Sequence, residues 1–298
     1  MNRMISSSGK PIEPMLWLLE VLIVPLFAAS LAYGQFTSGV NLVEVYATVT
    51  DERGQPLAGL TAADFTVQDE GVSQTITAFA PGEVPLAIAV AIDRSFSMAS
   101  GHGERLSASK AAARALVDAL RADDQVMVVA IGSETEVVAP LSQDREAAIR
   151  AVDRLDTWGA TPLYDAAVLA IDAVQHASGR RALVLLSDGV DRGSDVSAAD
   201  LLDRARHRDV IVYPIGIGDA RPPVFAELAA ATGGRSFFLK NASRDLGAEM
   251  TAIARELRLQ YLIGYAPPSP VAAGWHSIDV TVNRPRARVR ARDGYFAR

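Results

Sequence analysis

Three short clusters of oxygen-bearing side chains carry the clearest chemical pattern in this sequence. Together they supply two carboxylates, from Asp93 and Asp188, and three hydroxyls, from Ser95, Ser97 and Thr161. Hard oxygen donors of this kind select Mg²⁺, Mn²⁺ or Ca²⁺ over softer metals, and we expect Mg²⁺. Because hydroxyls are neutral, a cation held mainly by them keeps much of its charge. It can then accept a carboxylate from a partner as its last ligand.

The segments around these clusters predict a sheet that places them at one edge. Four apolar runs lack polar alternation, as strands buried on both faces do. They cover residues 86–92, 126–131, 182–186 and 210–217. Asp93 follows the first run directly, and Asp188 follows the third. Ligand sites of open α/β sheets lie beyond the carboxyl ends of such strands, so the clusters should converge there.

Amphipathic stretches separate the apolar runs and complete an α/β pattern. They cover residues 106–120, 145–155, 163–177, 197–205, 224–231 and 246–257. Strands that alternate with helices predict a doubly wound, mostly parallel sheet. The run 134–139 follows its predecessor too closely for a crossover helix, so we expect an antiparallel edge strand there.

The sections before and after this α/β unit have the alternation of half-buried strands. Val43, Val45 and Val49 alternate with polar residues, and the same period recurs around Ile263 and Val280. Sections of about 50 and about 40 residues are each too short to bury a stable β core alone. We therefore predict one smaller, discontinuous β-sandwich formed by residues 35–84 and 258–298, with residues 85–257 inserted between its halves.

The site pattern resembles that of a known family. Asp93-x-Ser95-x-Ser97, with Thr161 and the Asp188 of a Ser-Asp-Gly turn, is similar to the metal-ion-dependent adhesion site (MIDAS) of von Willebrand factor type A domains. The resemblance covers roughly residues 85–257 and implies a Rossmann-like fold. It also implies that Ser95, Ser97 and Thr161 bind the metal directly, while Asp93 and Asp188 act largely through water. The flanking segments resemble exported bacterial proteins described only as von Willebrand factor A-related.

These observations predict a metal-ion-dependent, adhesion-type protein-binding module rather than an enzyme, with no catalytic residues and no organic cofactor. Its partner would be a protein that supplies an Asp or Glu carboxylate. The alternative is a Mg²⁺-dependent phosphotransferase or hydrolase with Asp93 as the nucleophile. Such an enzyme needs a second acid two residues on, where Ser95 stands, and a lysine near the phosphate. Only Lys110 and Lys240 lie within residues 85–257. A third interpretation is a structural envelope protein whose metal site is vestigial. The five intact positions of the site argue against it.

Two further carboxylates lie near these motifs. Asp191 follows Asp188 by three residues, and we expect it to be a solvated loop carboxylate rather than an acceptor behind the metal ligands. Asp165 falls in the first turn of a predicted helix, where a negative charge favours the helix dipole.

Composition excludes several other classes of function. The 298-residue chain carries a net charge of −6 and no basic run, so nucleic acid is a poor partner. It has no cysteine, which removes disulfides, thiol nucleophiles and cysteine-ligated metals. Its four histidines lack the spacing of a zinc site.

The first 34 residues have the features of a secretory signal peptide. Arg3 and Lys10 precede an apolar stretch, and the uninterrupted part at 21–32 is short for a membrane span. We expect cleavage after Gly34 and a periplasmic or secreted protein. The alternative is an uncleaved N-terminal segment that anchors the protein, which would be its sole membrane attachment.

Overall fold

The computed structural model describes residues 42–82, 84–99, 104–219, 221–240, 246–268 and 270–297. The chain separates into Met1–Gly39 and Val40–Arg298, and every described residue belongs to the second part. The predicted signal peptide therefore lies outside the described residues. Within them, no helix is long and apolar enough to cross a membrane.

A six-stranded sheet forms the centre of the α/β region, with strand order β10-β9-β8-β5-β6-β7. Its strands are β5 (Leu86–Asp93), β6 (Gln125–Ile131), β7 (Thr135–Ser142), β8 (Arg180–Ser187), β9 (Ile211–Ile217) and β10 (Phe237–Leu239). All neighbours pair in parallel except β7, which runs antiparallel to β6 at the edge, as the sequence predicted. Asp93 is level with Ile131, and Ser187 with Gly216. The ends of the four long parallel strands thus lie along one edge.

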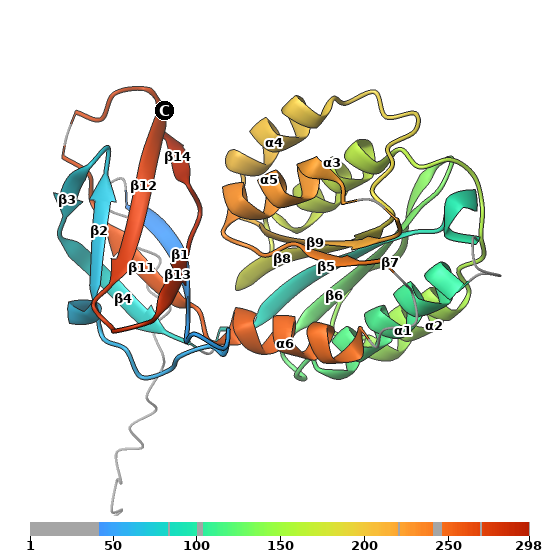
Figure 1. The fold of residues 1–298 in the computed structure, drawn as a ribbon, viewed down its shortest axis with the longest axis horizontal. Coiled ribbons are helices and arrows are strands. Elements are labelled where there is room, and N and C mark those ends of the chain that lie inside the picture. The colour runs from blue at the N-terminus through green and yellow to red at the C-terminus, as the bar shows by residue number, and fades with distance from the viewer. Residues whose placement is uncertain are drawn as a thin grey trace, which may run out of the picture. The chain divides into compact units, whose positions relative to one another are not determined.

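Helices cover both faces of this sheet (Figure 1). One face carries α1 (Glu104–Asp118), α2 (Arg145–Asp153) and α6 (Gly247–Arg258), and the other carries α3 (Leu163–Val174), α4 (Ala198–Arg206) and α5 (Pro223–Thr232). Ser197 and Asp200 form a capping box at the start of α4. The α/β class predicted from sequence is confirmed.

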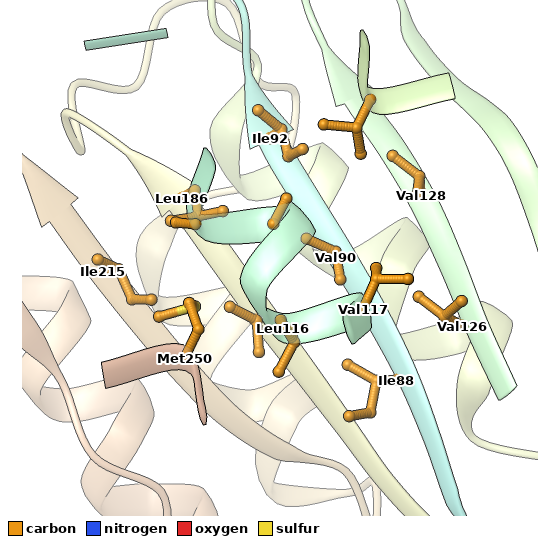
Figure 2. Packing of buried hydrophobic residues seen from close by; sticks show 14 of the residues in the cluster. Ile88, Val90, Ile92, Leu116, Val117, Val126, Val128, Leu186, Ile215 and Met250 are labelled. Carbon is orange, nitrogen blue, oxygen red and sulfur yellow. The ribbon is translucent and has the colours of Figure 1, made fainter. Parts of the chain in front are cut away.

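Strand β5 presents different side chains to its two faces, and this determines how closely each helix layer packs. Ile88, Val90 and Ile92 enter a cluster with Leu116 of α1 and Met250 of α6 (Figure 2). The two positions between them are alanines, which face the layer that contains α3. Small side chains there let the alanine-rich face of α3 approach the sheet closely. The first site loop therefore starts from a strand that is rigidly held on both sides.

The flanking sections form two further four-stranded sheets, in the orders β13-β1-β11-β4 and β14-β12-β2-β3. Their strands are β1 (Val43–Thr50), β2 (Phe65–Asp69), β3 (Val72–Gln74), β4 (Ile76–Pro81), β11 (Tyr261–Tyr265), β12 (Gly274–Val282), β13 (Arg288–Arg290) and β14 (Gly294–Ala297). The N-terminal β1 pairs with the C-terminal β11, and β2 pairs with β12. A shared core includes Val45, Phe65, Tyr261 and Ile263, so the apolar side chains of the two flanks are buried together.

Two features of the strands were not predicted from the sequence. Residues 289–296 contribute to two short strands, β13 and β14, which belong to different sheets. The short parallel strand β10 was not predicted. It contains three residues, and so short a segment carries no readable period.

Candidate metal centre

Asp93 occupies the end of β5 and is fully buried. Its Oδ1 accepts a hydrogen bond from the backbone N–H of Ser95 at 2.8 Å, and its Oδ2 accepts one from the Ser187 hydroxyl at 2.6 Å. Burial raises the pKa of Asp93 from 3.8 to about 6, against these hydrogen bonds, and the nearby charge of Asp188 adds to the rise. Within the described ranges, no Lys or Arg forms an ion pair with this carboxylate.

The two site serines lie side by side in the loop that follows. Their Oγ atoms are 3.0 Å apart, and Ser95 is buried while Ser97 is partly exposed. The loop turns through a short 3₁₀ helix, Phe96–Ala99, in which the N–H of Met98 donates to the carbonyl of Ser95. Asp93, Ser95 and Ser97 therefore form one connected group, as the D-x-S-x-S spacing predicted.

Thr161 is buried in the second site loop. Backbone hydrogen bonds connect this loop to the first and the third site loops. The N–H of Phe96 donates to the carbonyl of Gly159 at 3.1 Å, and the N–H of Arg192 donates to the carbonyl of Thr161 at 2.7 Å. Gly159 has φ +82°, and a Cβ there would stand 2.3 Å from the backbone N of Ser133, so only glycine fits this turn. The three loops are thereby held to one another by backbone contacts.

Asp188 follows β8 and is largely buried. Its Oδ1 accepts from the N–H of Val190 at 3.1 Å. Its Oδ2 lies 3.9 Å from Nη1 of Arg105, whose Nη2 also bonds Asp219 at 2.9 Å. Arg105 lies in the first turn of α1, and sequence reasoning did not assign it to the site because nothing in its local pattern links it to Asp188.

Asp191 is not a solvated loop carboxylate, so that expectation was wrong. Its Oδ1 accepts from the N–H of Leu163 at 2.9 Å and from the hydroxyl of Ser194 at 2.6 Å. The bond from Leu163 caps the start of α3, whose own N-cap residue, Pro162, provides no side-chain cap. Sequence spacing could not reveal this cap because donor and acceptor belong to different loops.

Asp165 also does more than favour the helix dipole. Its two carboxylate oxygens accept from the N–H groups of Asp195 and Val196 at 3.0 and 2.9 Å. Together with Asp191, it fixes the loop after β8 against the start of α3. The second and third site loops are therefore rigid relative to each other.

The donor set fits a hard divalent cation. Asp93 is a buried carboxylate without a cationic partner among the described residues, and hydroxyl oxygens lie beside it. No group of three or more His, Cys, Asp or Glu side chains suited to a metal occurs in the described part of the chain. A site there would use hydroxyls for several of its ligands, and those ligands favour Mg²⁺ or Mn²⁺ over a soft metal.

The family assignment agrees with this geometry. The sequence model of the von Willebrand factor type A domain matches residues 88–190, which include the loops of Asp93, Thr161 and Asp188. The chain contains a von Willebrand factor type A domain. The matched segment begins in β5 and ends just after β8, so it holds all five predicted ligands of the type A domain.

Curated relatives are distant and cover only part of this chain. An uncharacterised protein of Synechocystis is 28% identical over 169 residues, which are 55% of this chain and 40% of that protein. An uncharacterised protein of Borreliella burgdorferi is 26% identical over 140 residues, 45% of this chain and 41% of that protein. The chain thus spans about two-fifths of the length of these relatives.

Solved structures share the fold. A von Willebrand factor type A protein from Catenulispora acidiphila has a TM-score of 0.53 and 18% identity, over 88% of this chain and 65% of that one. Proximal thread matrix protein 1 from the mussel byssus has a TM-score of 0.51 and 17% identity, over 71% and 50% of the two chains. The same mussel protein with a zinc-occupied MIDAS motif has a TM-score of 0.50 and 16% identity, over 59% and 48%.

Proposed function

We propose that this chain binds a protein partner through a divalent cation held by Asp93, Ser95, Ser97, Thr161 and Asp188. The observation that carries the proposal is the buried Asp93 carboxylate, which lacks a cationic partner among the described residues and lies beside the two serine hydroxyls. The resemblance assigns direct coordination to the hydroxyls and water-mediated contacts to the two carboxylates. Mg²⁺ is the expected ion, with Mn²⁺ and Ca²⁺ as alternatives. The cation would attract a carboxylate of the partner into its open coordination position.

The distribution of lysines favours binding over phosphoryl transfer. Lys110 donates to the carbonyls of Asp153 and Leu155 at 2.7 and 2.9 Å, so it is engaged at the end of α2. Lys240 is exposed and follows β10, one of the two edge strands of the sheet. Position 95, where a phosphotransferase would need a second acid, holds a serine whose hydroxyl meets that of Ser97. We therefore propose a non-enzymatic module.

We further infer the domain boundaries and the location. Residues 35–84 and 258–298 form one discontinuous β-sandwich that receives the type A domain, residues 85–257, as an insertion. The pairing of β1 with β11 and the shared flank core support this division. The sequence of residues 1–34 supports export to the periplasm or the extracellular space, with an uncleaved anchor as the alternative.

The function is tested by calorimetric titration of Mg²⁺ or Mn²⁺ into the whole chain and into an Asp93→Ala variant. The matched control is Asp123→Ala, which removes an exposed carboxylate just before β6, at the opposite end of the parallel strands. We expect the wild type and the control to bind the ion, and Asp93→Ala to lose it while still folding. Equal binding by all three would contradict the site. Turnover of generic phosphate esters that required Asp93 would favour the phosphotransferase.

A further inference from the structure

Large apolar side chains are exposed around the candidate metal centre. Five such residues are exposed in the described part of the chain: Val72, Phe96, Val137, Trp158 and Val190. Phe96 is 68% exposed, Trp158 40% and Val190 45%. Each of these three comes from a different site loop: Phe96 stands between the two serines, Trp158 precedes Thr161, and Val190 follows Asp188. We call Phe96, Trp158 and Val190 the apolar rim.

Backbone contacts hold the rim residues in place. The N–H of Trp158 donates to the carbonyl of Arg94 at 2.6 Å, and the N–H of Phe96 donates to the carbonyl of Gly159 at 3.1 Å. Val190 donates its own N–H to the Asp188 carboxylate. Rim positions fixed in this way lose little conformational entropy when a partner covers them.

Trp158 is also oriented by its side-chain contacts. The Arg94 guanidinium lies 5.0 Å from the indole centroid, and a Cβ at Gly132 would stand 2.8 Å from Cε3 of the ring. The indole is therefore packed on its own domain, yet two-fifths of the residue stays exposed. Tryptophan in this half-exposed, supported setting is a frequent anchor of protein interfaces.

A bound cation would favour an acidic ligand. Arg94 and Arg105 lie at the site, but Arg94 pairs with Glu136, and Arg105 pairs with Asp188 and Asp219. The divalent cation itself would therefore supply the positive charge that attracts an acid. An acidic group is thus favoured at the centre, while apolar groups are favoured on the rim.

We propose that the partner of this site is a protein segment in which an Asp or Glu is flanked, within about two residues, by large apolar side chains. This inference rests on the proposed function, because the acid would bind the cation while its neighbours cover the apolar rim. An acid flanked by glycine or polar residues would bind the cation but leave the rim exposed to water. The rim therefore makes the site selective among carboxylates.

The test uses synthetic peptides displayed densely on a biosensor surface. One peptide carries Leu-Asp-Leu between glycines, a second carries Gly-Asp-Gly, and a third carries Leu-Asn-Leu. Binding of the whole chain is measured in Mn²⁺ and in EDTA. We expect the Leu-Asp-Leu peptide to bind in Mn²⁺ about tenfold more tightly than Gly-Asp-Gly, a difference of ~1.4 kcal/mol. The Leu-Asn-Leu peptide should not bind.

Variants then assign the preference to the rim. Trp158→Ala and Val190→Ser should each reduce the preference for Leu-Asp-Leu severalfold, while calorimetry shows an unchanged affinity for Mn²⁺. The matched control is Val72→Ser, because Val72 is 60% exposed on β3 of a flanking sheet and should not affect either measurement.

The outcomes separate this inference from the proposed function. Metal-dependent binding of both Asp peptides with equal affinity would overturn the apolar selectivity and leave the metal-dependent function intact. Equal binding in Mn²⁺ and EDTA would overturn both. Binding of Leu-Asn-Leu as tight as that of Leu-Asp-Leu would show an apolar surface that needs no acid, and would also overturn the proposal.

Discussion

Replacing Asp93 with asparagine should stabilise the protein in the absence of divalent metal. The carboxylate is fully buried, and its pKa rises from 3.8 to about 6, mainly through burial. Asparagine can keep the first of its two hydrogen bonds and replace the second by one of opposite direction. Its Oδ1 can accept from the N–H of Ser95, and its Nδ2 can donate to the hydroxyl of Ser187. That hydroxyl already accepts from Gly189 but has a second lone pair.

The size of the stabilisation by Asp93→Asn, and the way it changes with pH, follow from the pKa of Asp93. Below about pH 3 the carboxyl is protonated in both the folded and the unfolded protein, so the charge has no effect on stability. Between pH 4 and 6 the unfolded chain ionises first, and wild-type stability falls. Above about pH 6 the wild type has lost the full amount of stability. A pKa difference of roughly two between the folded and unfolded states corresponds to ~3 kcal/mol in the free energy of unfolding.

The assay is urea unfolding of wild type and Asp93→Asn in EDTA between pH 4 and 8. We expect a difference of about 0.5 kcal/mol at pH 4 that grows to about 3 kcal/mol in favour of the variant by pH 8. Excess Mg²⁺ should reverse the order, because it stabilises only the protein that binds it. The exposed Asp123→Asn variant serves as the control. A variant less stable than wild type at pH 8 in EDTA, or a difference independent of pH, would refute this account of Asp93.

Three other changes test a site loop, the opposite end of the central sheet and the flanking sheets. Gly159→Ala would force φ +82° on alanine and press its Cβ against Ser133, so we expect a loss of ~1–3 kcal/mol by urea unfolding together with weaker metal binding. Arg258→Met would leave the buried Asp124 carboxylate without its ion pair, and should cost about 3–5 kcal/mol. Adding Asp124→Asn should recover much of that loss, and a fully additive double variant would contradict the pairing. Deleting residues 258–298 removes β11 and β12 from β1 and β2, and should produce aggregates by size-exclusion chromatography. A monomeric truncation with an unchanged Tm would count against the discontinuous sandwich.

The positions of the strands and of the site loops could be predicted from the sequence because their signals are local. Buried runs such as 86–92 contain almost no polar residue, and the residue after such a run must lie at the sheet edge. The antiparallel edge strand β7 could be predicted because its connection to β6 is too short for a crossover. The polar residues Asp93 and Asp188 then stood out as carboxylates at strand ends.

Long-range polar contacts could not be predicted in this way. Arg180 has the composition of a surface residue, yet it is fully buried and donates to the carbonyls of Leu257 and Gln260 at the end of α6. Its guanidinium also lies 4.8 Å from the ring centroid of Tyr46. These partners are far away in the sequence and offer no periodic signal. Sheet membership was equally hidden, because alternation in 289–296 does not say which sheet each part joins.

The contacts of the acidic residues near the site explain why a cation bound there would need a carboxylate from the partner. Asp165 and Asp191 lie close to the site, but both oxygens of Asp165 and Oδ1 of Asp191 already accept hydrogen bonds. Asp188 is partly balanced by Arg105 at 3.9 Å. Asp93 also accepts two hydrogen bonds, but it is the most deeply buried of these four carboxylates, and one carboxylate cannot neutralise a divalent cation. The remaining positive charge would face outward between Phe96, Trp158 and Val190, where an acid with apolar neighbours can satisfy both the cation and the rim.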